Sequence, residues 1–441
     1  MQNYPVYRNM TLGQSVSCPN KGKRAFESKV VCKKKRNAQN VVTKHKVRLV
    51  AKGFSQLEGL DYFETTSPVV SHAAMRTLIA TAAAKGHELF QIDIENAFLN
   101  APLEEEIYMR MPKGMRKFDN QGREIVCRLN KAVYGLKQAS RAFYKKLRTV
   151  LLGLLGFKPC LVEPCLFRLE KDGQEITVST YVDDMPSSCS DPKLKQWFLD
   201  SLKKEFTITE GPLQWCLGVK VEPASDGGVN LSQQAYIGNV YNAFAQDVKH
   251  RTYSVPLDPD VKLAHVPAPV KDSYEWKHAQ EKPYRQLVGA LLYCCITRPD
   301  VQFAVLVLAG FMQNWSMVHY RAAIRVITYL HQTSHLCLHY SRSAEITLKS
   351  LSDAEFASQH PDCRSVSGFL IYLGTSLISW ASKKQTLVAL STAAAEYYAL
   401  SVAVQEVAYL KVLMGFLGHP LDGPTTMHVG VDPTLKYPSF P

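Results

Sequence analysis

The sequence has no apolar run long enough to cross a membrane. Its longest apolar stretches, Leu287 to Ile296 and Phe303 to Met312, fall short of the ~20 residues that a transmembrane helix needs. The opening residues, MQNYPVYRNM, lack the apolar core of a signal peptide. We therefore expect neither a membrane protein nor a secreted one.

Paired cysteines are also absent, because none of the 11 cysteines belongs to a Cys-x-x-Cys motif. An odd cysteine count without a secretion signal is typical of a reducing compartment, with buried thiols rather than disulfides or a zinc ribbon. Internal repeats and low-complexity tracts are missing as well. These absences leave an ordinary globular chain.

Acidic residues are the minority among the charges: 39 Asp and Glu stand against 52 Lys and Arg, which gives a net charge of +13 and a pI of about 9.1. This balance favours a polyanionic partner and says nothing about fold. The 441 residues, 46% of them hydrophobic, can bury a core and predict about three globular units.

Hydrophobic periodicity predicts the main elements. After a loose lead-in over 1–25, alternating apolar and basic residues in SKVVCKKKRN and KHKVRLVAKGF predict a hairpin. Helices are expected over 71–85, 139–155 and 283–331. Stretches rich in Pro, Asp and Gly at 223–228 and 256–272 predict linkers. The last part predicts a strand at EITLKSLSDA, a hairpin turning at 374–376, and a helix from Ser391 or Thr392 to about Leu417.

Three aspartates stand at the ends of apolar strands: Asp93 in FQIDIENAF, and Asp183 and Asp184 in TYVDDM. A carboxylate flanked by apolar residues is costly to bury unless a cation pairs with it. Two such strands side by side would gather the carboxylates around Mg²⁺, and a two-metal site stabilises an in-line phosphoryl displacement. An Asp-Asp pair after a strand also marks ordinary turns, so the pair alone leaves both interpretations open.

Long sequence blocks around these aspartates resemble a known family. The blocks KVRLVAKGFSQLEGLDYFETTSPV, FQIDIENAFLNAPLEEEIYMRMPKG, VCRLNKAVYGLKQASRAFY and YVDDM are similar, in order, to the reverse transcriptase of copia-type LTR retrotransposons. The blocks PYRQLVGALLYCCITRPDVQFAV, SLSDAEFAS and ISWASKKQTLVALSTAAAEYYAL continue the likeness into the RNase H part of the same polyprotein, so it covers roughly residues 26 to 432.

This resemblance implies an α/β (α+β) right-hand polymerase followed by an RNase H-like domain. The fingers and a palm with a small antiparallel sheet would occupy 26–222, and a helical thumb and connection 223–345. The RNase H-like domain would occupy 346–441.

The same resemblance assigns the polymerase site. Asp93, Asp183 and Asp184 match the polymerase aspartates; Asp93 and Asp183 would be the main metal ligands, assisted by the carbonyl of Ile94. Phe98 matches the aromatic steric gate that leaves no room for a ribose 2′-hydroxyl. Without the family, Phe98 would be a core aromatic residue.

Four further residues fall in blocks that the family uses to hold substrate. Lys46, Arg48 and Lys52 match the basic fingers strand, where they could grip the triphosphate, and Gln138 matches a loop near the incoming base pair. An isolated basic strand is more often a solvated face.

A second group of acids, Asp353, Glu396 and Asp432, matches the RNase H site of the family. One carboxylate from a strand, one from a helix and one from a later strand can converge on two metals. There a metal-activated water would hydrolyse the RNA strand of an RNA–DNA hybrid, which the 2′-hydroxyl distinguishes from DNA. Taken singly, each residue would be a surface acid.

The sequence departs from the family at three places. Ala394 replaces the first glutamate of the Ala-Glu-Ala-Glu-Tyr block, and the chain after Asp432 diverges, so we expect a truncated RNase H-like domain. Met185-Pro186-Ser187-Ser188 replaces β-branched residues, and the proline predicts that the returning strand of this hairpin is broken or displaced. Such departures indicate a decayed or fragmentary element.

The predicted function is therefore RNA-directed DNA polymerase with RNase H. Its cofactor would be Mg²⁺, with Mn²⁺ as a substitute, and its partners an RNA template, a DNA primer, an RNA–DNA hybrid and dNTPs, without a membrane. The resemblance implies a cytoplasmic virus-like particle or the nucleus as its location. Two alternatives stay open: an inactive relic that keeps the fold and binds nucleic acid, and an unrelated basic metal-dependent nuclease that uses only Asp353 and Glu396.

Overall fold

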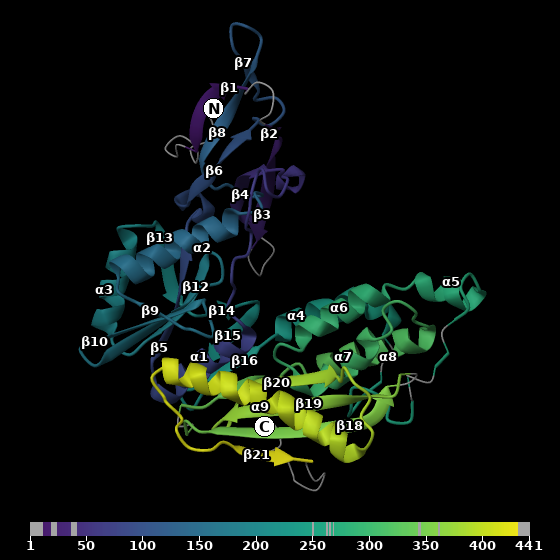
Figure 1. The fold of residues 1–441 in the computed structure, drawn as a ribbon. Coiled ribbons are helices and arrows are strands. Elements are labelled where there is room, and N and C mark those ends of the chain that lie inside the picture. The colour runs from purple at the N-terminus through teal and green to yellow at the C-terminus, as the bar shows by residue number, and fades with distance from the viewer. Residues whose placement is uncertain are drawn as a thin grey trace. The chain divides into compact units, whose positions relative to one another are not determined.

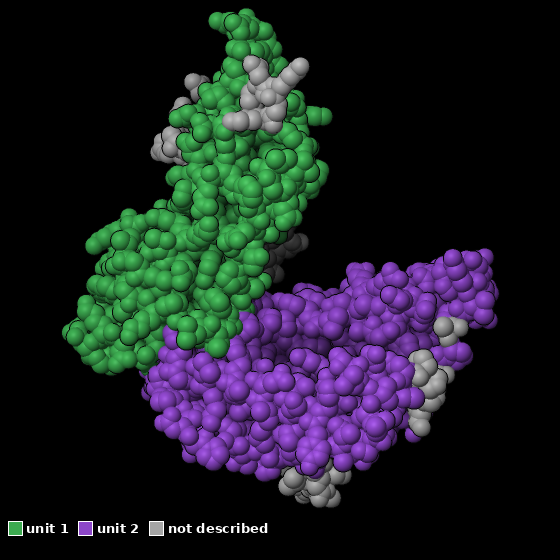
Figure 2. Space-filling model, in the orientation of Figure 1, with its two compact units in different colours: residues 1–70, 90–187, 191–211 green, residues 71–89, 188–190, 212–441 purple. Residues whose placement is uncertain are grey.

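The chain divides into two compact units, both mixed α/β, which Figure 2 colours separately. The computed structural model describes residues 12–18, 24–36, 42–248, 251–261, 263, 266–267, 269–342, 345–359 and 362–430. Unit 1 comprises 1–70, 90–187 and 191–211, and unit 2 comprises 71–89, 188–190 and 212–441.

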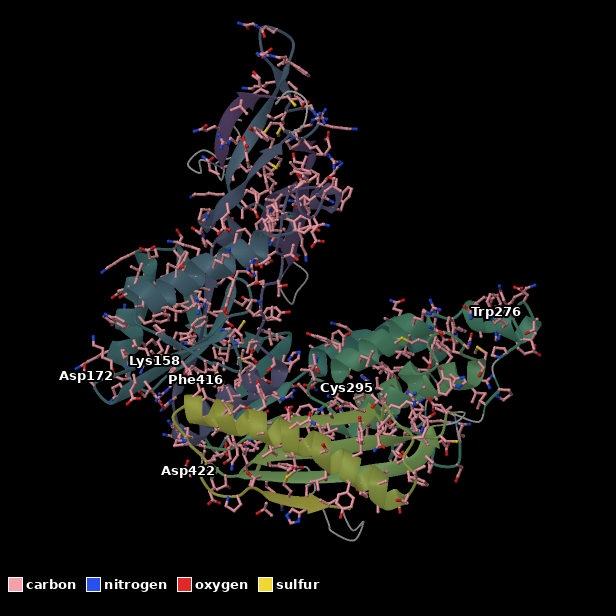
Figure 3. All side chains as sticks on the ribbon, in the orientation of Figure 1. Lys158, Asp172, Trp276, Cys295, Phe416 and Asp422 are labelled. Atoms are coloured by element: carbon pink, nitrogen blue, oxygen red, sulfur yellow. The ribbon has the colours of Figure 1, made fainter. Side chains whose placement is uncertain are left out.

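The sheet that carries the first aspartates has six strands in the order β13–β5–β12–β11–β10–β9. These strands are β5 (Glu88–Ile94), β9 (Lys158–Pro159), β10 (Leu166–Lys171), β11 (Gln174–Ser179), β12 (Asp184–Cys189) and β13 (Ile208–Pro212). Helix α3 (Pro192–Lys203) packs against β11, and its Phe198 ring lies 5.3 Å from that of Phe157. Asp172 forms the tight turn between β10 and β11 with a φ of 53° (Figure 3).

Helix α2 (Ala139–Thr149) confirms the helix expected over 139–155. It continues as a π-helical turn, Val150–Leu154, and the chain leaves it at Gly156, whose φ is 75°. Phe143 and Leu147 are buried on the apolar face of α2. Lys146 and Arg148 occupy its last turn, where the negative end of the helix dipole stabilises positive charge.

The strand β12 runs unbroken through Pro186, between β5 and β11. The prediction that this proline breaks or displaces the strand is therefore wrong. Proline removes one donor from a sheet but leaves its carbonyl available. Here the buried Ser179 hydroxyl donates to the Pro186 carbonyl at 2.7 Å, so a side chain supports the strand where the ladder lacks a donor.

A second sheet of unit 1 has the order β1–β8–β6–β2, with β7 also on β8. Its strands are β1 (Gly13–Ser17), β2 (Ala25–Phe26), β6 (Pro102–Met109), β7 (Lys117–Phe118) and β8 (Glu124–Lys131). The expectation of a loose lead-in over 1–25 is wrong for β1, which pairs antiparallel with β8 and places Val16 opposite Val126. Gly13 is needed there, because a Cβ would lie 1.8 Å from the Arg128 carbonyl oxygen.

The predicted basic hairpin is confirmed as β3 (Ser28–Arg36) and β4 (Val42–Ala51). Its register sets Val30 opposite Leu49 and Lys33 opposite Lys46, so apolar and basic residues occupy opposite faces as expected. Lysines facing each other across a ladder repel, which favours an anionic partner on the basic face.

Unit 2 begins with α1 (His72–Lys85), for which the prediction of an Ala-rich helix is confirmed. The Ser71 hydroxyl accepts from the Ala74 N–H as the N-cap, and Gly86 ends the helix with a φ of 69°. The sequence did not reveal that Arg76 is buried: it lies 3.8 Å from the Trp380 ring centroid and donates to the Ile378 carbonyl at 2.7 Å.

Helices and a small sheet follow. The sheet has the order β14 (Trp215–Cys216), β15 (Val219–Pro223), β16 (Val229–Ser232) and β17 (Leu338–Tyr340). The helices are α4 (Gln234–Ala243), α5 (Tyr274–Gln280), α6 (Tyr284–Cys294), α7 (Gln302–Ala309) and α8 (Met317–Gln332). The expected linker at 223–228 is wrong because these residues form the β15–β16 turn, and the domain boundary at 222/223 falls inside that hairpin.

The last sheet of unit 2 has the order β20–β19–β18–β21, and helix α9 crosses it (Figure 1). Its elements are β18 (Leu348–Gln359), β19 (Arg364–Leu373), β20 (Ser376–Lys384), α9 (Thr392–Phe416) and β21 (Thr426–Val429). These confirm the predicted strand, hairpin and Ser391-capped helix. The boundary at 345/346 separates this sheet from β17, but both sheets belong to unit 2.

The expectation that no segment is apolar and long enough to cross a membrane does not hold for helix α9, which ends at Phe416 (Figure 3) and meets that test by length and composition alone. In the structure it packs on β18 and β19 through buried residues, and Ser379 of β20 donates to Glu406 at 2.6 Å. The helix is therefore the core helix of this sheet.

Candidate functional site

The first two candidate carboxylates lie at the ends of neighbouring strands. Asp93 is the penultimate residue of β5, Asp183 immediately precedes β12, and the Ile94 N–H donates to the Asp183 carbonyl at 3.2 Å. Asp93 is exposed and Asp183 half-buried. This contact between the two backbones brings the aspartates to one edge of the sheet.

The turn that carries Asp183 is tight and strained. Tyr181 and Asp184 exchange backbone hydrogen bonds of 2.8 and 3.2 Å, which leaves Val182 and Asp183 as the two loop residues. Val182 has a φ of 59°, an unfavourable conformation for a β-branched residue in a position that usually takes glycine. Backbone strain of this kind concentrates at functional sites.

Asp184 is the first residue of β12 and is exposed. Among the residues that the structure describes, no three His, Cys, Asp or Glu side chains are arranged to hold a metal ion. The structure therefore brings Asp93 and Asp183 together. Within the described residues, the three aspartates do not form a complete metal site.

A tyrosine that the sequence did not indicate, Tyr134, lies beside the predicted Phe98 and within reach of the charges of these aspartates. The Tyr134 ring packs edge-on against Phe98, with the centroids 4.7 Å apart and the planes at 68°. Burial raises the pKa of Tyr134, the negative charges of Asp183 and Asp93 raise it further, and the Arg48 guanidinium opposes them. Both carboxylates thus act on one tyrosine, whose only sequence signal is its place in the block KAVYGLKQAS.

The basic fingers strand reaches the same place. Lys46 and Arg48 lie two residues apart and so share one face of β4. The Arg48 guanidinium carbon lies 5.0 Å from the Tyr134 ring centroid. The Arg48 Nε is buried without a hydrogen-bond partner among the described residues, so the guanidinium keeps unused donor capacity. Lys52 follows the strand, and its backbone N–H donates to the Glu27 carbonyl at 2.7 Å.

Gln138 precedes α2 and is buried. Its carbonyl accepts from the Gln56 amide at 3.0 Å, and its amide donates to the Asp61 carbonyl at 3.1 Å. These bonds tie Gln138 to the loop that follows the fingers strand. Its proposed place near a base pair remains a prediction.

The second pair of carboxylates meets between a strand and a helix. The Ala354 N–H on β18 is shared between Asp353 Oδ1, at 2.9 Å, and Glu396 Oε1 on α9, at 3.2 Å. Burial raises the pKa of Glu396, and the neighbouring charge of Asp353 raises it further. The Glu396 Oε2 atom is buried without a partner among the described residues, which leaves a vacant acceptor beside a second carboxylate.

Asp432, the third predicted acid of this group, lies outside the described residues. The strand before it is confirmed: β21 pairs parallel with β18, with Val429 opposite Ser352, and the Gly430 N–H donates to the Ser352 carbonyl at 3.2 Å. The chain therefore approaches the edge that carries Asp353 from a later strand, as expected.

Aspartates at adjacent strand ends of a mixed α/β unit, faced by an aromatic pair and a basic hairpin, define the class of palm-and-fingers nucleotide polymerases. The chain belongs to the family described as reverse transcriptase (RNA-dependent DNA polymerase), whose model matches residues 12–257. The matched segment contains Asp93, Tyr134 and Asp183.

Several transposon proteins are similar along most of the chain. The retrovirus-related Pol polyprotein from transposon RE1 of Arabidopsis thaliana is 34% identical over 397 residues, which cover 90% of this chain and 26% of that protein. Its counterpart from transposon TNT 1-94 of Nicotiana tabacum is 36% identical over 404 residues, which cover 90% of this chain and 30% of that protein. The chain is thus similar to transposon Pol polyproteins and spans under a third of the length of these relatives.

One solved structure, the foamy viral protease-reverse transcriptase in complex with double-stranded DNA, aligns with a TM-score of 0.45 and 12% identity. The alignment covers 87% of this chain and 56% of that one.

Proposed function

We propose that this chain catalyses RNA-directed DNA synthesis at Asp93 and Asp183, copying an RNA template from a DNA primer with dNTPs. The proposal is supported chiefly by the backbone hydrogen bond from Ile94 to Asp183, which holds the two aspartates at one sheet edge. The primer 3′-hydroxyl would attack the α-phosphate of a dNTP, and pyrophosphate would leave.

Asp93 and Asp183 are suited to hold Mg²⁺, because hard cations prefer carboxylate oxygens together with substrate phosphates. When bound, magnesium stabilises charge on the attacking and leaving oxygens of phosphoryl transfer. The protein's own groups do the rest. Arg48, with its unused donor, binds the triphosphate alongside Lys46 and Lys52, while the Phe98 ring excludes a ribose 2′-hydroxyl.

We extend the proposal to an RNase H-like activity in unit 2. Asp353 and Glu396 fit a cation because two carboxylates share one N–H and the vacant Glu396 Oε2 faces no partner in the described chain. Burial and, to a smaller degree, the charge of Asp353 raise the pKa of Glu396, and a cation there would offset both. Asp432 is the third candidate ligand, and the substrate would be the RNA strand of an RNA–DNA hybrid.

The net charge of +13 supports nucleic-acid partners, because Lys and Arg replace the counterions of a phosphate backbone. Binding to a primer–template should therefore weaken steeply as salt rises. A virus-like particle or the nucleus remains the proposed location.

Primer extension tests the polymerase proposal. The wild-type chain, with an RNA template, a DNA primer, dNTPs and Mg²⁺, should extend the primer, and Asp183→Ala should reduce the rate by at least about a hundredfold. Equal extension by both proteins would refute the assignment of Asp183.

A catalytically inactive relic that still binds nucleic acid is the second candidate. It is favoured by the lack, within the described residues, of any three acids positioned for a metal, and by Ala394 in the RNase H block. Failure of the wild-type chain to extend a primer that it binds tightly would establish the relic.

A further inference from the structure

Tyr134 occupies a central position among the groups that the proposed function assigns to the nucleotide. Its ring contacts Phe98 edge-on at 4.7 Å, and Arg48 lies over it at 5.0 Å. It is half-buried rather than enclosed in the core, so it lines the site instead of filling the interior. The Tyr134 side chain therefore contacts both Phe98, the proposed steric gate, and Arg48, which is proposed to bind the triphosphate.

The backbone around Tyr134 is fixed independently of its side chain. The Tyr134 carbonyl accepts from the Ala51 N–H, at the end of β4, at 2.8 Å. The next residue, Gly135, has a φ of 93° and lies so close to Ala51 that a Cβ would approach its carbonyl oxygen to 2.1 Å. Changing the Tyr134 side chain should thus leave the connection between this loop and the fingers strand in place.

Phe98, the other ring of the pair, lies on a short element of the backbone. Phe98 belongs to a single 3-10 turn, Ala97–Asn100, which the chain enters through Asn96 in the left-handed conformation with a φ of 52°. The Ala132 N–H donates to the Ala101 carbonyl at 2.9 Å, so the two segments run side by side. The turn also packs against α2 and β8, and the Tyr134 ring meets the Phe98 ring edge-on, a contact that restricts the orientation of the Phe98 ring.

We propose that Tyr134 is a positioning residue that holds the Phe98 ring in the orientation that excludes a ribose 2′-hydroxyl, and so sets the preference for deoxynucleotides. The inference rests on the proposed polymerase function. The aromatic ring carries this role through its edge-on contact, so a phenylalanine should perform it as well as the tyrosine.

The test compares Tyr134→Leu with Tyr134→Phe. The readout is the ratio of kcat/KM for a dNTP to that for the matching rNTP, measured by single-nucleotide extension. We expect Tyr134→Leu to lower this ratio roughly three- to tenfold, the value of an aromatic pair, and Tyr134→Phe to keep it. Tyr134→Met, which supplies a flexible apolar side chain without a flat ring, should match Tyr134→Leu and replaces it if that variant does not fold.

Nucleotide affinity gives a readout independent of turnover. A dideoxy-terminated primer on its template traps the ternary complex, and the Kd for dNTP and rNTP can be compared directly. Tyr134→Leu should tighten rNTP binding relative to dNTP. Tyr144→Leu is the matched control: it removes a half-buried tyrosine of unit 1 that donates to the Pro164 carbonyl at 2.9 Å, and the ratio should not change.

The double variant Phe98→Ala/Tyr134→Leu separates positioning from a general structural role. If Tyr134 acts through Phe98, adding Tyr134→Leu to Phe98→Ala should leave the ratio unchanged. An unchanged ratio in Tyr134→Leu, or equal losses of rate with both nucleotides, would overturn the inference. A wild-type chain that fails to extend, or a Phe98→Ala ratio like that of the wild type, would instead contradict the proposed function beneath it.

Discussion

The two carboxylate pairs of the molecule are assembled by different parts of the chain. Asp93 and Asp183 come together because their strands are neighbours, joined at that edge by a backbone hydrogen bond from Ile94. Asp353 and Glu396 come together as side chains, one from a strand and one from a helix, around the single N–H of Ala354. The first pair is placed by the sheet and the second by helix packing.

This difference has an electrostatic consequence. Glu396 is partly buried and sits against a like charge, which raises its pKa, and its Oε2 atom has no partner in the described chain. On the proposed function, a cation would relieve this repulsion at the second pair even without substrate. The first pair opens toward Tyr134, Phe98 and Arg48, groups suited to a nucleotide. We infer that metal alone acts on the second pair, whereas the first is completed by substrate.

The largest expected effect comes from removing one charge of the second pair. Glu396→Gln should reduce cleavage of an RNA–DNA hybrid by at least about a hundredfold, because a charged metal ligand is lost. The Mg²⁺-dependent rise in melting temperature should also shrink, because less metal binds the folded chain. Primer extension should be unchanged.

The control for this experiment is Asp183→Ala, which should give the reverse pattern, with cleavage kept and extension lost. A Glu396→Gln protein that shows the full Mg²⁺-dependent rise would break the comparison, because metal would then bind without the second pair.

Strong periodicity made most of the elements predictable. The basic hairpin alternates over two long strands, and α9 combines a Ser391 cap with small residues at helical spacing, so local pattern and final fold agree. The strand β1 has only GQSVS and gains its stability from β8, which no local pattern reveals. The effect of Pro186 was predicted wrongly for a similar reason: the strand is supported by the hydroxyl of Ser179, which belongs to another strand and is not visible in the local sequence.

Some residues of the candidate sites could be predicted from the sequence and others could not. The structure brings Asp93 close to Asp183 and Asp353 close to Glu396, and the roles of these residues stay predictions. Tyr134 was missed because an aromatic residue in a loop has no periodicity, and its importance comes from Phe98 and Arg48, far away in sequence. The buried Arg76 was missed because an arginine in an Ala-rich helix normally reaches solvent.

A smaller effect is expected at the turn that holds Asp183. Val182→Gly should raise the free energy of unfolding by about 1 kcal/mol, because it removes a strained φ. It should also slow primer extension by up to about a hundredfold, since a looser turn misplaces the carboxylate. Urea unfolding and single-turnover extension measure the two effects.

Ala357→Gly is the matched control, since Ala357 has a φ of 47° beside the irregularity in β18. It should stabilise the chain similarly while extension stays the same. If Val182→Gly extends primers at the wild-type rate, the strain at this turn has no part in placing Asp183.

The smallest expected effect concerns acid, which acts with opposite sign on Asp119 of unit 1 and on Glu396 of unit 2. Asp119 of unit 1 accepts from the Arg123 N–H and Gln121 N–H, both at 2.9 Å, and from the Ser17 hydroxyl of β1 at 3.0 Å. The Arg123 backbone bond is the leading cause that lowers the pKa of Asp119 to about 2.

The lowered pKa of Asp119 stabilises the fold above the ordinary value near 3.8, and this contribution is lost as pH falls toward 2. The raised pKa of Glu396 works the other way, because protonation there favours the folded state. Asp119→Asn should therefore have a lower urea midpoint than the wild type at pH 5, and the difference should narrow as pH falls and close only below pH 2. Parallel midpoint curves for the two proteins would show that the carboxylate charge does not hold β1 in place.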